Sequence, residues 1–217
     1  GKALMKIAGK VILQIIMDRL LLVVPKERIS IATSTEGTDD PIARWSYENG
    51  FSCYRGSLDN VADRFYQAAQ KPGWQYAVRI NGDNVFVDTE LLREMLAIAQ
   101  SGEYDFISNV KGRTFPKGMS VEIVKLDHYA SVLPAIQESE SHKEHVTSYL
   151  YEHDNGRHCY LFNKHLPEAS GIQMALDTAE DFERTQKIME RFTEPHWNYN
   201  LKEIYFIWKQ LGYEQTI

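Results

Sequence analysis

Short apolar segments alternate with helical patterns through the first half of the chain, and this alternation restricts the fold more than any other feature. The segments 29–34, 51–55, 76–80 and 105–109 have the length and apolar character of strands. Helical patterns of roughly 10–15 residues separate them. Because strands joined by helices form parallel βαβ units, the sequence predicts an α/β fold with a mainly parallel sheet.

The second half of the chain interrupts this alternation. A loop at 111–118 and a strand at 119–126 are followed by short helices and an edge strand. The apolar segment 172–176 then returns to the core, and two further helices follow it. We therefore predict a single domain over residues 1–217 with an insertion at about 110–165.

Charge, cysteine content and hydropathy exclude several classes of protein. The net charge of −6 argues against a general nucleic-acid-binding protein, which would need clustered cations for the phosphates. Cys53 and Cys159 lie far apart in no ligand spacing, which fits neither a disulfide framework nor a zinc site and indicates a cytoplasmic protein. The apolar run 11–24 contains Asp18 and Arg19, so we expect no membrane span.

Two aspartates follow apolar strands, at the positions where α/β sheets bind ligands. Asp83 lies in the turn after 76–80, and Asp177 follows 172–176 directly before a helix. Ligands of open α/β sheets bind outside the carboxyl ends of the strands. The two carboxylates are therefore candidates for holding one Mg²⁺, which prefers hard oxygen ligands and substrate phosphates. Taken separately, each also fits an ordinary turn or helix cap.

A series of short motifs occurs in a fixed order between residue 1 and about residue 190. They are the segments 1–4, 7–10, 32–34, 55–64, 79–83, 108–109, 114–122, 144–147, 176–178 and 180–182. Together they resemble the cytidylyltransferase family that includes CMP-Kdo synthetases and acylneuraminate cytidylyltransferases. The greatest similarity is to the branch named for spore-coat polysaccharide biosynthesis.

This resemblance implies a fold and a reaction. The fold would be a Rossmann-like three-layer α/β sandwich, often dimerised through the inserted segment. The reaction would couple CTP to an acidic sugar, such as a nonulosonic acid or a Kdo-like sugar, to give a CMP-sugar and pyrophosphate with the help of Mg²⁺. The product would serve surface polysaccharide biosynthesis.

The resemblance also assigns roles to individual residues. Those predicted to act on the phosphates are Lys2, Arg79 and Asp83. Those predicted to bind the nucleotide are Ala32, Thr33, Ser34, Ser57 and Asn81. Those predicted to bind the acceptor sugar are Arg113, Lys117, Glu122, Glu144 and His145. The metal would be held by Asp83 and Asp177.

Several of these residues have an equally simple structural interpretation. Arg79 sits in an apolar strand and needs a partner, which is either a phosphate or one of Asp59 and Asp63. Ser57 fits a helix N-terminal cap as well as a ligand contact. His145 is also a candidate general base, because imidazole exchanges protons near neutral pH.

Family members usually begin with a strand and a phosphate-binding loop that ends in Gly-Lys, whereas this sequence begins at Gly1-Lys2. Roughly 15–20 residues would precede Gly1 in such a protein. A sheet without that strand would expose two edges, so we interpret the sequence as a fragment rather than as a degenerate relative.

Two other functions fit parts of the sequence. A GT-A-type glycosyltransferase has a similar sheet and can hold a metal at an acidic turn, but the segment 81–83 lacks the second acid of the usual Asp-x-Asp spacing. A degenerate nucleotide-binding scaffold is favoured only by the missing phosphate loop.

Overall fold

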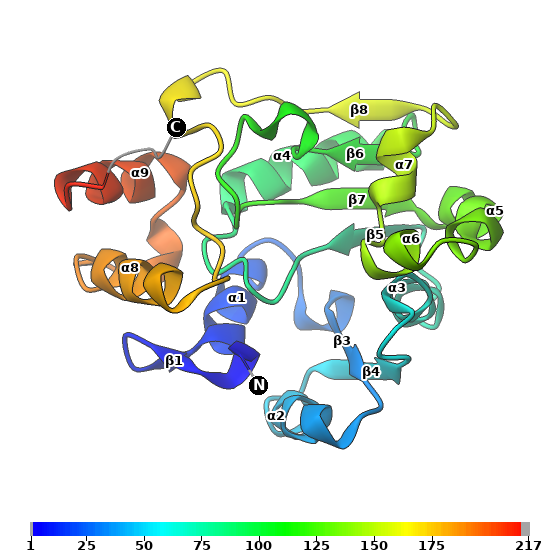
Figure 1. Cartoon of the computed structure of the whole chain (residues 1–217), viewed down its shortest axis with the longest axis horizontal. Helices are drawn as coiled ribbons and strands as arrows, with labels where there is room; N and C mark the ends of the chain where they lie inside the picture. The colour runs from blue at the N-terminus through cyan, green and yellow to red at the C-terminus, as the bar shows by residue number, and fades with distance from the viewer. Residues whose placement is uncertain (1, 214–217) are drawn as a thin grey trace.

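The structure is a computed structural model that describes residues 2–213, and its strands and helices follow the predicted alternation (Figure 1). The strands are β1 (Lys6–Ile7), β2 (Lys10–Val11), β3 (Ser30–Ser34), β4 (Ser52–Gly56), β5 (Tyr76–Arg79), β6 (Phe106–Ser108), β7 (Glu122–Lys125) and β8 (His158–Tyr160). The α-helices are α1 (Ile12–Leu20), α2 (Asp40–Glu48), α3 (Val61–Gln70), α4 (Thr89–Gln100), α5 (Leu126–Ile136), α6 (Glu140–Glu144), α7 (Ser148–Glu152), α8 (Ala179–Met189) and α9 (Leu201–Gln210). A 3-10 turn, η4 (Lys111–Arg113), follows β6.

The central sheet has four strands in the order β5-β7-β6-β8. β6 and β8 run parallel, whereas β7 runs antiparallel to both β5 and β6. β3 and β4 form a separate parallel pair, and within residues 2–213 neither strand hydrogen-bonds to the central sheet. The α/β prediction is confirmed. The strand predicted within the insertion contributes β7 to the middle of the sheet.

Helices cover both faces of the central sheet and produce three layers. Side chains alternate between the faces of a strand, so neighbours on β6 and β7 enter different cores. Ile107 and Ile123 enter the larger core, which α1, α4, α8 and α9 line. Phe106 and Val124 enter the smaller core beneath α3 and α5, where the Tyr129 side chain is fully buried.

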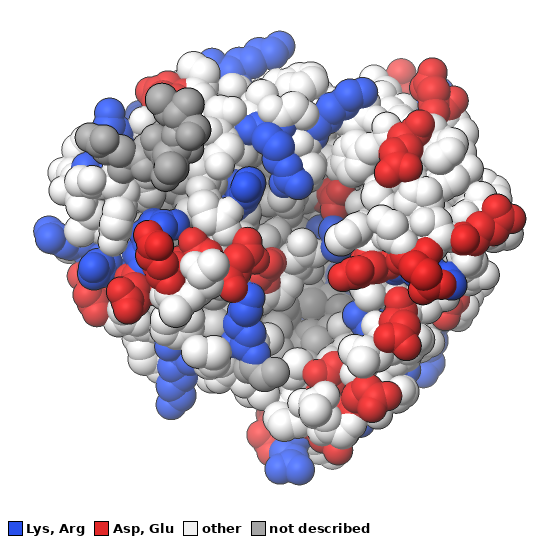
Figure 2. All heavy atoms as spheres, in the orientation of Figure 1, with Lys and Arg blue, Asp and Glu red and all other residues white. Residues whose placement is uncertain are grey.

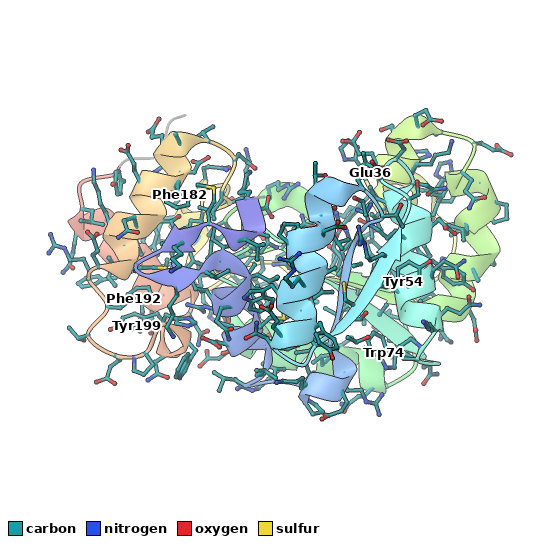
Figure 3. The ribbon with its side chains drawn as sticks, turned by 90° about the horizontal axis from the view of Figure 1, so that it is seen from below. Glu36, Tyr54, Trp74, Phe182, Phe192 and Tyr199 are labelled. Atoms are coloured by element: carbon teal, nitrogen blue, oxygen red, sulfur yellow. The ribbon has the colours of Figure 1, made fainter. Side chains whose placement is uncertain are left out.

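The C-terminal part of the described chain packs on the larger core. Tyr205 and Trp208 on α9 are buried there. Phe192 and Tyr199 stack with ring centroids 3.9 Å apart, and Figure 3 shows the pair on the opposite side of the molecule from Tyr54 of β4. Among residues 2–213, no helix combines the length and apolar character that crossing a bilayer requires.

Arg19, on the first helix, is fully buried and holds three separate segments together. Its guanidinium donates hydrogen bonds to the carbonyl oxygens of Val87, His196 and Tyr199, at 3.1, 2.5 and 2.9 Å. Burial lowers the pKa of Arg19 to about 10, so it remains charged at neutral pH.

Arg19→Met is therefore expected to lower the free energy of unfolding by about 3 kcal/mol, because three carbonyls lose their donor and two of those hydrogen bonds are buried. Chemical denaturation would measure this change. Arg28→Met, at an exposed position, should change stability by less than about 0.5 kcal/mol. Equal effects of the two substitutions would contradict the assigned role of Arg19.

Candidate active site

A cavity of about 500 Å³ opens where the turn after β5, the loop after β6 and the start of α7 meet. Figure 2 shows a hollow near the middle of this face, with Lys and Arg side chains along the rim above it. The cavity is lined by many of the residues predicted from the sequence. They are Arg79, Asn81, Asp83, Arg113, Lys117, Glu122, His145 and Asp177. The fold thus collects two candidate metal ligands and three of the predicted cations in one space, which Lys111 also lines.

Asp83 and Asp177 form the acidic side of the cavity. Asp83 Oδ1 is buried and has no hydrogen-bond partner within the described chain. Burial raises the pKa of Asp83, the nearby Asp177 carboxylate raises it further, and Lys2 and Arg79 act in the opposite direction. Asp177 Oδ2 accepts a hydrogen bond of 2.7 Å from Gln173.

These two carboxylates suit a hard divalent cation. An unpartnered buried oxygen beside a second carboxylate is the donor set that Mg²⁺ prefers. The described residues contain no group of three or more His, Cys, Asp or Glu side chains placed to hold a metal. A cation bound here would therefore take its remaining ligands from phosphates and water.

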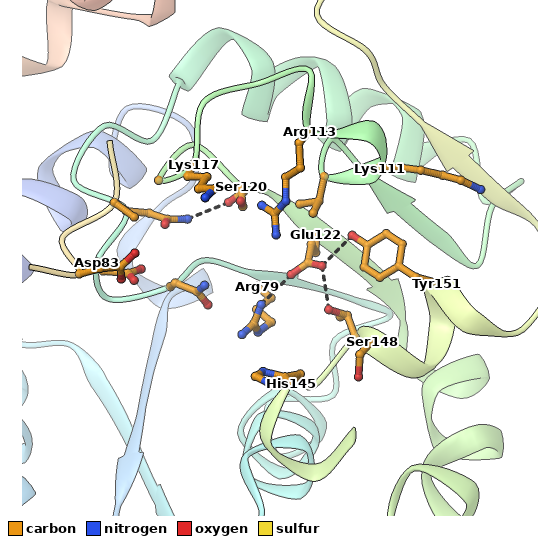
Figure 4. Close-up of a pocket in the computed structure, with 17 residues that line it drawn as sticks. Arg79, Asp83, Lys111, Arg113, Lys117, Ser120, Glu122, His145, Ser148 and Tyr151 are labelled. Carbon is orange, nitrogen blue, oxygen red and sulfur yellow. Dashed lines mark hydrogen bonds and ion pairs between the residues drawn. The ribbon is translucent and has the colours of Figure 1, made fainter. Parts of the chain in front are cut away.

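The basic side of the cavity comes from the strand and loop that the sequence singled out. Figure 4 shows the Arg113 side chain directed into the cavity above Arg79, with Lys117 further along the same loop. Lys111 belongs to the same loop and lines part of the cavity, but its ammonium lies 4.2 Å from the centre of the Tyr160 ring. Three cations facing two carboxylates can bind a phosphorylated ligand together with its counterion.

Glu122 lies between these two sides and is already fully engaged. Its side chain is 5% exposed, and Oε2 lies 2.6 Å from Nη1 of Arg79. Oε1 accepts hydrogen bonds from the hydroxyls of Thr147 and Tyr151, both at 2.7 Å. Arg79 therefore pairs with Glu122, and the alternative pairing with Asp59 or Asp63 is wrong.

The residues predicted for the nucleotide do not line this cavity, apart from Asn81. Ala32, Thr33 and Ser34 end β3, where both hydroxyls donate to Asp39. These bonds, led by the one from Ser34, hold the pKa of Asp39 below its usual value. Ser57 Oγ accepts a hydrogen bond from the Asn60 amide in the turn before α3, and the N-terminal cap of that helix is Asn60 rather than Ser57. Their binding of a nucleotide stays a prediction.

Two further predicted residues lie at the margin of the site. Lys2 Nζ donates a hydrogen bond to the carbonyl of Leu176, the residue directly before Asp177. The positive charge of Lys2 acts to lower the pKa of Asp83. Glu144 is exposed at the end of α6 and does not line the cavity. The lining of the cavity therefore does not support the prediction that Glu144 contacts the acceptor sugar.

The sequence patterns do not indicate that α7 forms one wall of the cavity, as the structure shows. Thr147, Ser148 and Tyr151 all line it. Thr147 and Tyr151 are four residues apart, so helical spacing already places both side chains on one face. Val146, directly before them, has φ of 39°, a strained conformation for a β-branched residue and one that clusters at functional sites.

Comparison with known proteins agrees with this geometry. The family model for cytidylyltransferases matches residues 1–211. The spore coat polysaccharide biosynthesis protein SpsF of Bacillus subtilis (strain 168) is 28% identical over 201 residues, which cover 89% of this chain and 82% of that protein.

Solved structures share the fold. A cytidylyltransferase from Leptospira borgpetersenii serovar Hardjo-bovis (strain JB197) has a TM-score of 0.87 at 25% identity, over 100% of this chain and 92% of that chain. A CMP:2-keto-3-deoxy-manno-octonic acid synthetase complexed with CTP has a TM-score of 0.59 at 13% identity, over 88% of this chain and 92% of that chain, which shows a common fold.

The α/β sheet, the acidic turn and the opposing cations are those of a nucleotidyltransferase enzyme. The chain belongs to the cytidylyltransferase family, whose model matches it over residues 1–211. This membership confirms the resemblance drawn from the motifs. It also favours nucleotidyl transfer over the glycosyltransferase and scaffold alternatives.

Proposed function

We propose that this protein transfers CMP from CTP to an acidic sugar in a Mg²⁺-dependent reaction, for the biosynthesis of a surface polysaccharide. The observation that carries the proposal is the single cavity in which Asp83 and Asp177 face Arg79, Arg113 and Lys117. Membership of the cytidylyltransferase family supports CTP as the nucleotide. The name of the Bacillus subtilis relative supports a role in polysaccharide biosynthesis.

In this reaction a sugar hydroxyl oxygen would form a bond to the α-phosphorus, and the bond from that phosphorus to pyrophosphate would break. His145 lines the cavity and would accept the hydroxyl proton. Asp83 and Asp177 would hold Mg²⁺, which when bound neutralises charge on the phosphates. Arg79 would stabilise the negative charge that the leaving pyrophosphate gains.

The acceptor would be recognised through its carboxylate. Arg113 and Lys117 reach the cavity from a loop, and neither side chain forms a salt bridge within the described residues. A guanidinium binds a carboxylate through two parallel hydrogen bonds, which a neutral sugar cannot form. This pair therefore supports an acidic acceptor over a neutral one.

The proposal is tested by calorimetric titration of CTP into the full-length protein with and without Mg²⁺, followed by a screen for pyrophosphate release. We expect CTP to bind only with Mg²⁺, and pyrophosphate to appear with nonulosonic or Kdo-like acids but not with their methyl esters. Binding of no nucleoside triphosphate would refute the proposal. Equal rates with an acid and with its ester would refute the carboxylate-recognising part. Light scattering would test the homodimer that the resemblance implies.

A further inference from the structure

We propose that Glu122 is a positioning residue, which holds the Arg79 guanidinium toward an oxyanion of the bound ligand and does not contact the ligand itself. The inference rests on the proposed function and departs from the sequence-based prediction that Glu122 binds the sugar. Both carboxylate oxygens of Glu122 already have protein partners, and the side chain is 5% exposed. Little of this carboxylate remains available to a ligand.

The sheet itself sets the pairing of Glu122 with Arg79. The two residues lie directly opposite each other in the antiparallel pair of β5 and β7. Cross-strand neighbours of opposite charge stabilise each other, and the two backbones fix their separation. Only Nη1 of Arg79 contacts a carboxylate within the described chain, and the side chain is 22% exposed. The other guanidinium N–H groups remain for an oxyanion in the cavity that Arg79 lines (Figure 4).

Hydrogen bonds also connect Glu122 to the loop that carries Arg113. Tyr151, which donates to Glu122, also contacts the hydroxyl of Ser108, and that hydroxyl accepts a 2.9 Å hydrogen bond from the Val110 amide. Burial, followed by the charge of Glu122, raises the pKa of Tyr151, so the phenol stays protonated and donates. Val110 directly precedes η4. Glu122 therefore bonds both to Arg79 on β5 and to Tyr151 on α7, and so fixes the positions of these two cavity walls relative to each other.

Charge and geometry predict opposite effects when Glu122 is changed to Gln. The Glu122 carboxylate repels an anion bound at Arg79, so removing its charge would by itself tighten binding of that anion. Removing the carboxylate also frees the guanidinium from its fixed position, which weakens binding. A loss of affinity in Glu122→Gln would therefore report lost geometry, because lost charge acts the other way.

The test uses binding titrations of Mg·CTP, and of N-acetylneuraminate in the presence of Mg·CTP. Glu122→Gln is expected to weaken one of the two ligands about tenfold, and Arg79→Gln should weaken the same ligand at least as much. The double variant should bind it no more weakly than Arg79→Gln alone, since Glu122 acts through Arg79. The weakened ligand identifies the oxyanion as a phosphate or as a carboxylate.

Two further variants separate positioning from general stability. Tyr151→Phe keeps every charge and removes one donor to Glu122, so it should weaken the same ligand to a smaller extent and only when Arg79 is present. Asp105→Asn removes the carboxylate that lies 3.8 Å from Lys125 at the other end of β7, and should leave both affinities within twofold.

The outcomes distinguish this inference from the proposed function. If the unmodified protein binds neither ligand, the proposed function fails. If it binds them but Glu122→Gln binds equally well or more tightly, or if its effect adds fully to that of Arg79→Gln, then Glu122 does not position Arg79 and the proposed function stands. Thermal unfolding of each variant would show that the comparison is made between folded proteins.

Discussion

Replacement of Asp83 by Asn is expected to lower kcat/KM for CMP transfer at least about 100-fold, the order of loss that follows removal of one main stabilising group from an active site. The amide has nearly the same shape as the carboxylate, so the variant removes charge and leaves packing unchanged. Because Asp83 Oδ1 is buried without a partner, nothing in the described chain compensates its charge fully. Steady-state pyrophosphate release and calorimetric titration of Mg·CTP would measure the loss.

The same substitution should not destabilise the fold, and this separates a functional residue from a structural one. Burying a carboxylate without a hydrogen-bond partner costs free energy in the folded state. We therefore expect the free energy of unfolding of Asp83→Asn to equal or exceed that of the unmodified protein. Asp127→Asn, an equal change of charge at an exposed site in the first turn of α5, should leave activity unchanged and lower the free energy of unfolding by no more than about 1 kcal/mol, because a helix N-terminus favours a negative charge. Loss of stability in Asp83→Asn with activity retained would refute the assignment.

The meeting of Asp83 and Asp177 illustrates what local sequence patterns can predict. Each follows a short apolar segment and comes before a helix, so the βαβ pattern already places both at the ligand-binding edge of the sheet. The cations Arg113 and Lys117 lie close together in the loop that follows the strand expected at 105–109, and clustered cations in one loop already indicate a site for a carboxylate. In each case the relevant information lies within a few residues of the site.

The pairing of Arg79 with Glu122 could not be predicted in this way. These residues are 43 positions apart, and their contact depends on β7 entering the sheet antiparallel between β5 and β6. Alternation of strands and helices predicts parallel neighbours and says nothing about an inserted antiparallel strand. The register of β5 against β7, rather than the composition of either strand, places the two side chains together.

The residues at the ends of β3 and β4 show a second limit. The pattern located β3 to within one residue, since 29–34 was expected and Ser30–Ser34 is observed. The parallel pairing of β3 with β4 across α2 follows the predicted βαβ unit, but the pattern does not indicate that, within residues 2–213, neither strand hydrogen-bonds to the central sheet. The resemblance to the family, rather than the strand pattern, assigns Thr33, Ser34 and Ser57 to the nucleotide, and these residues lie outside the lining of the cavity.

Gly118 supplies the second large expected effect, because two walls of the cavity touch at this residue. Its φ is +92°, and a Cβ built on it would lie 2.5 Å from both the amide nitrogen of Ala175 and the carbonyl carbon of Met174. The loop that carries Lys117 thus passes directly against the segment that leads to Asp177. No other residue type fits without moving one of these backbones.

Gly118→Ala is expected to lower the free energy of unfolding by about 3 kcal/mol, through a strained φ and an overpacked contact, and to lower kcat/KM at least about tenfold. Activity falls because the displaced backbone separates Asp177 from the cations opposite it.

Gly102→Ala is the matched control, since Gly102 has φ of +71° but a Cβ added there would meet no described atom within 4 Å. Denaturation and pyrophosphate-release assays of the two variants would separate the causes. The control should lose about 1 kcal/mol of stability and keep its activity, because strain alone leaves the cavity intact. If both variants lose activity equally, close packing at Gly118 does not hold the two walls together.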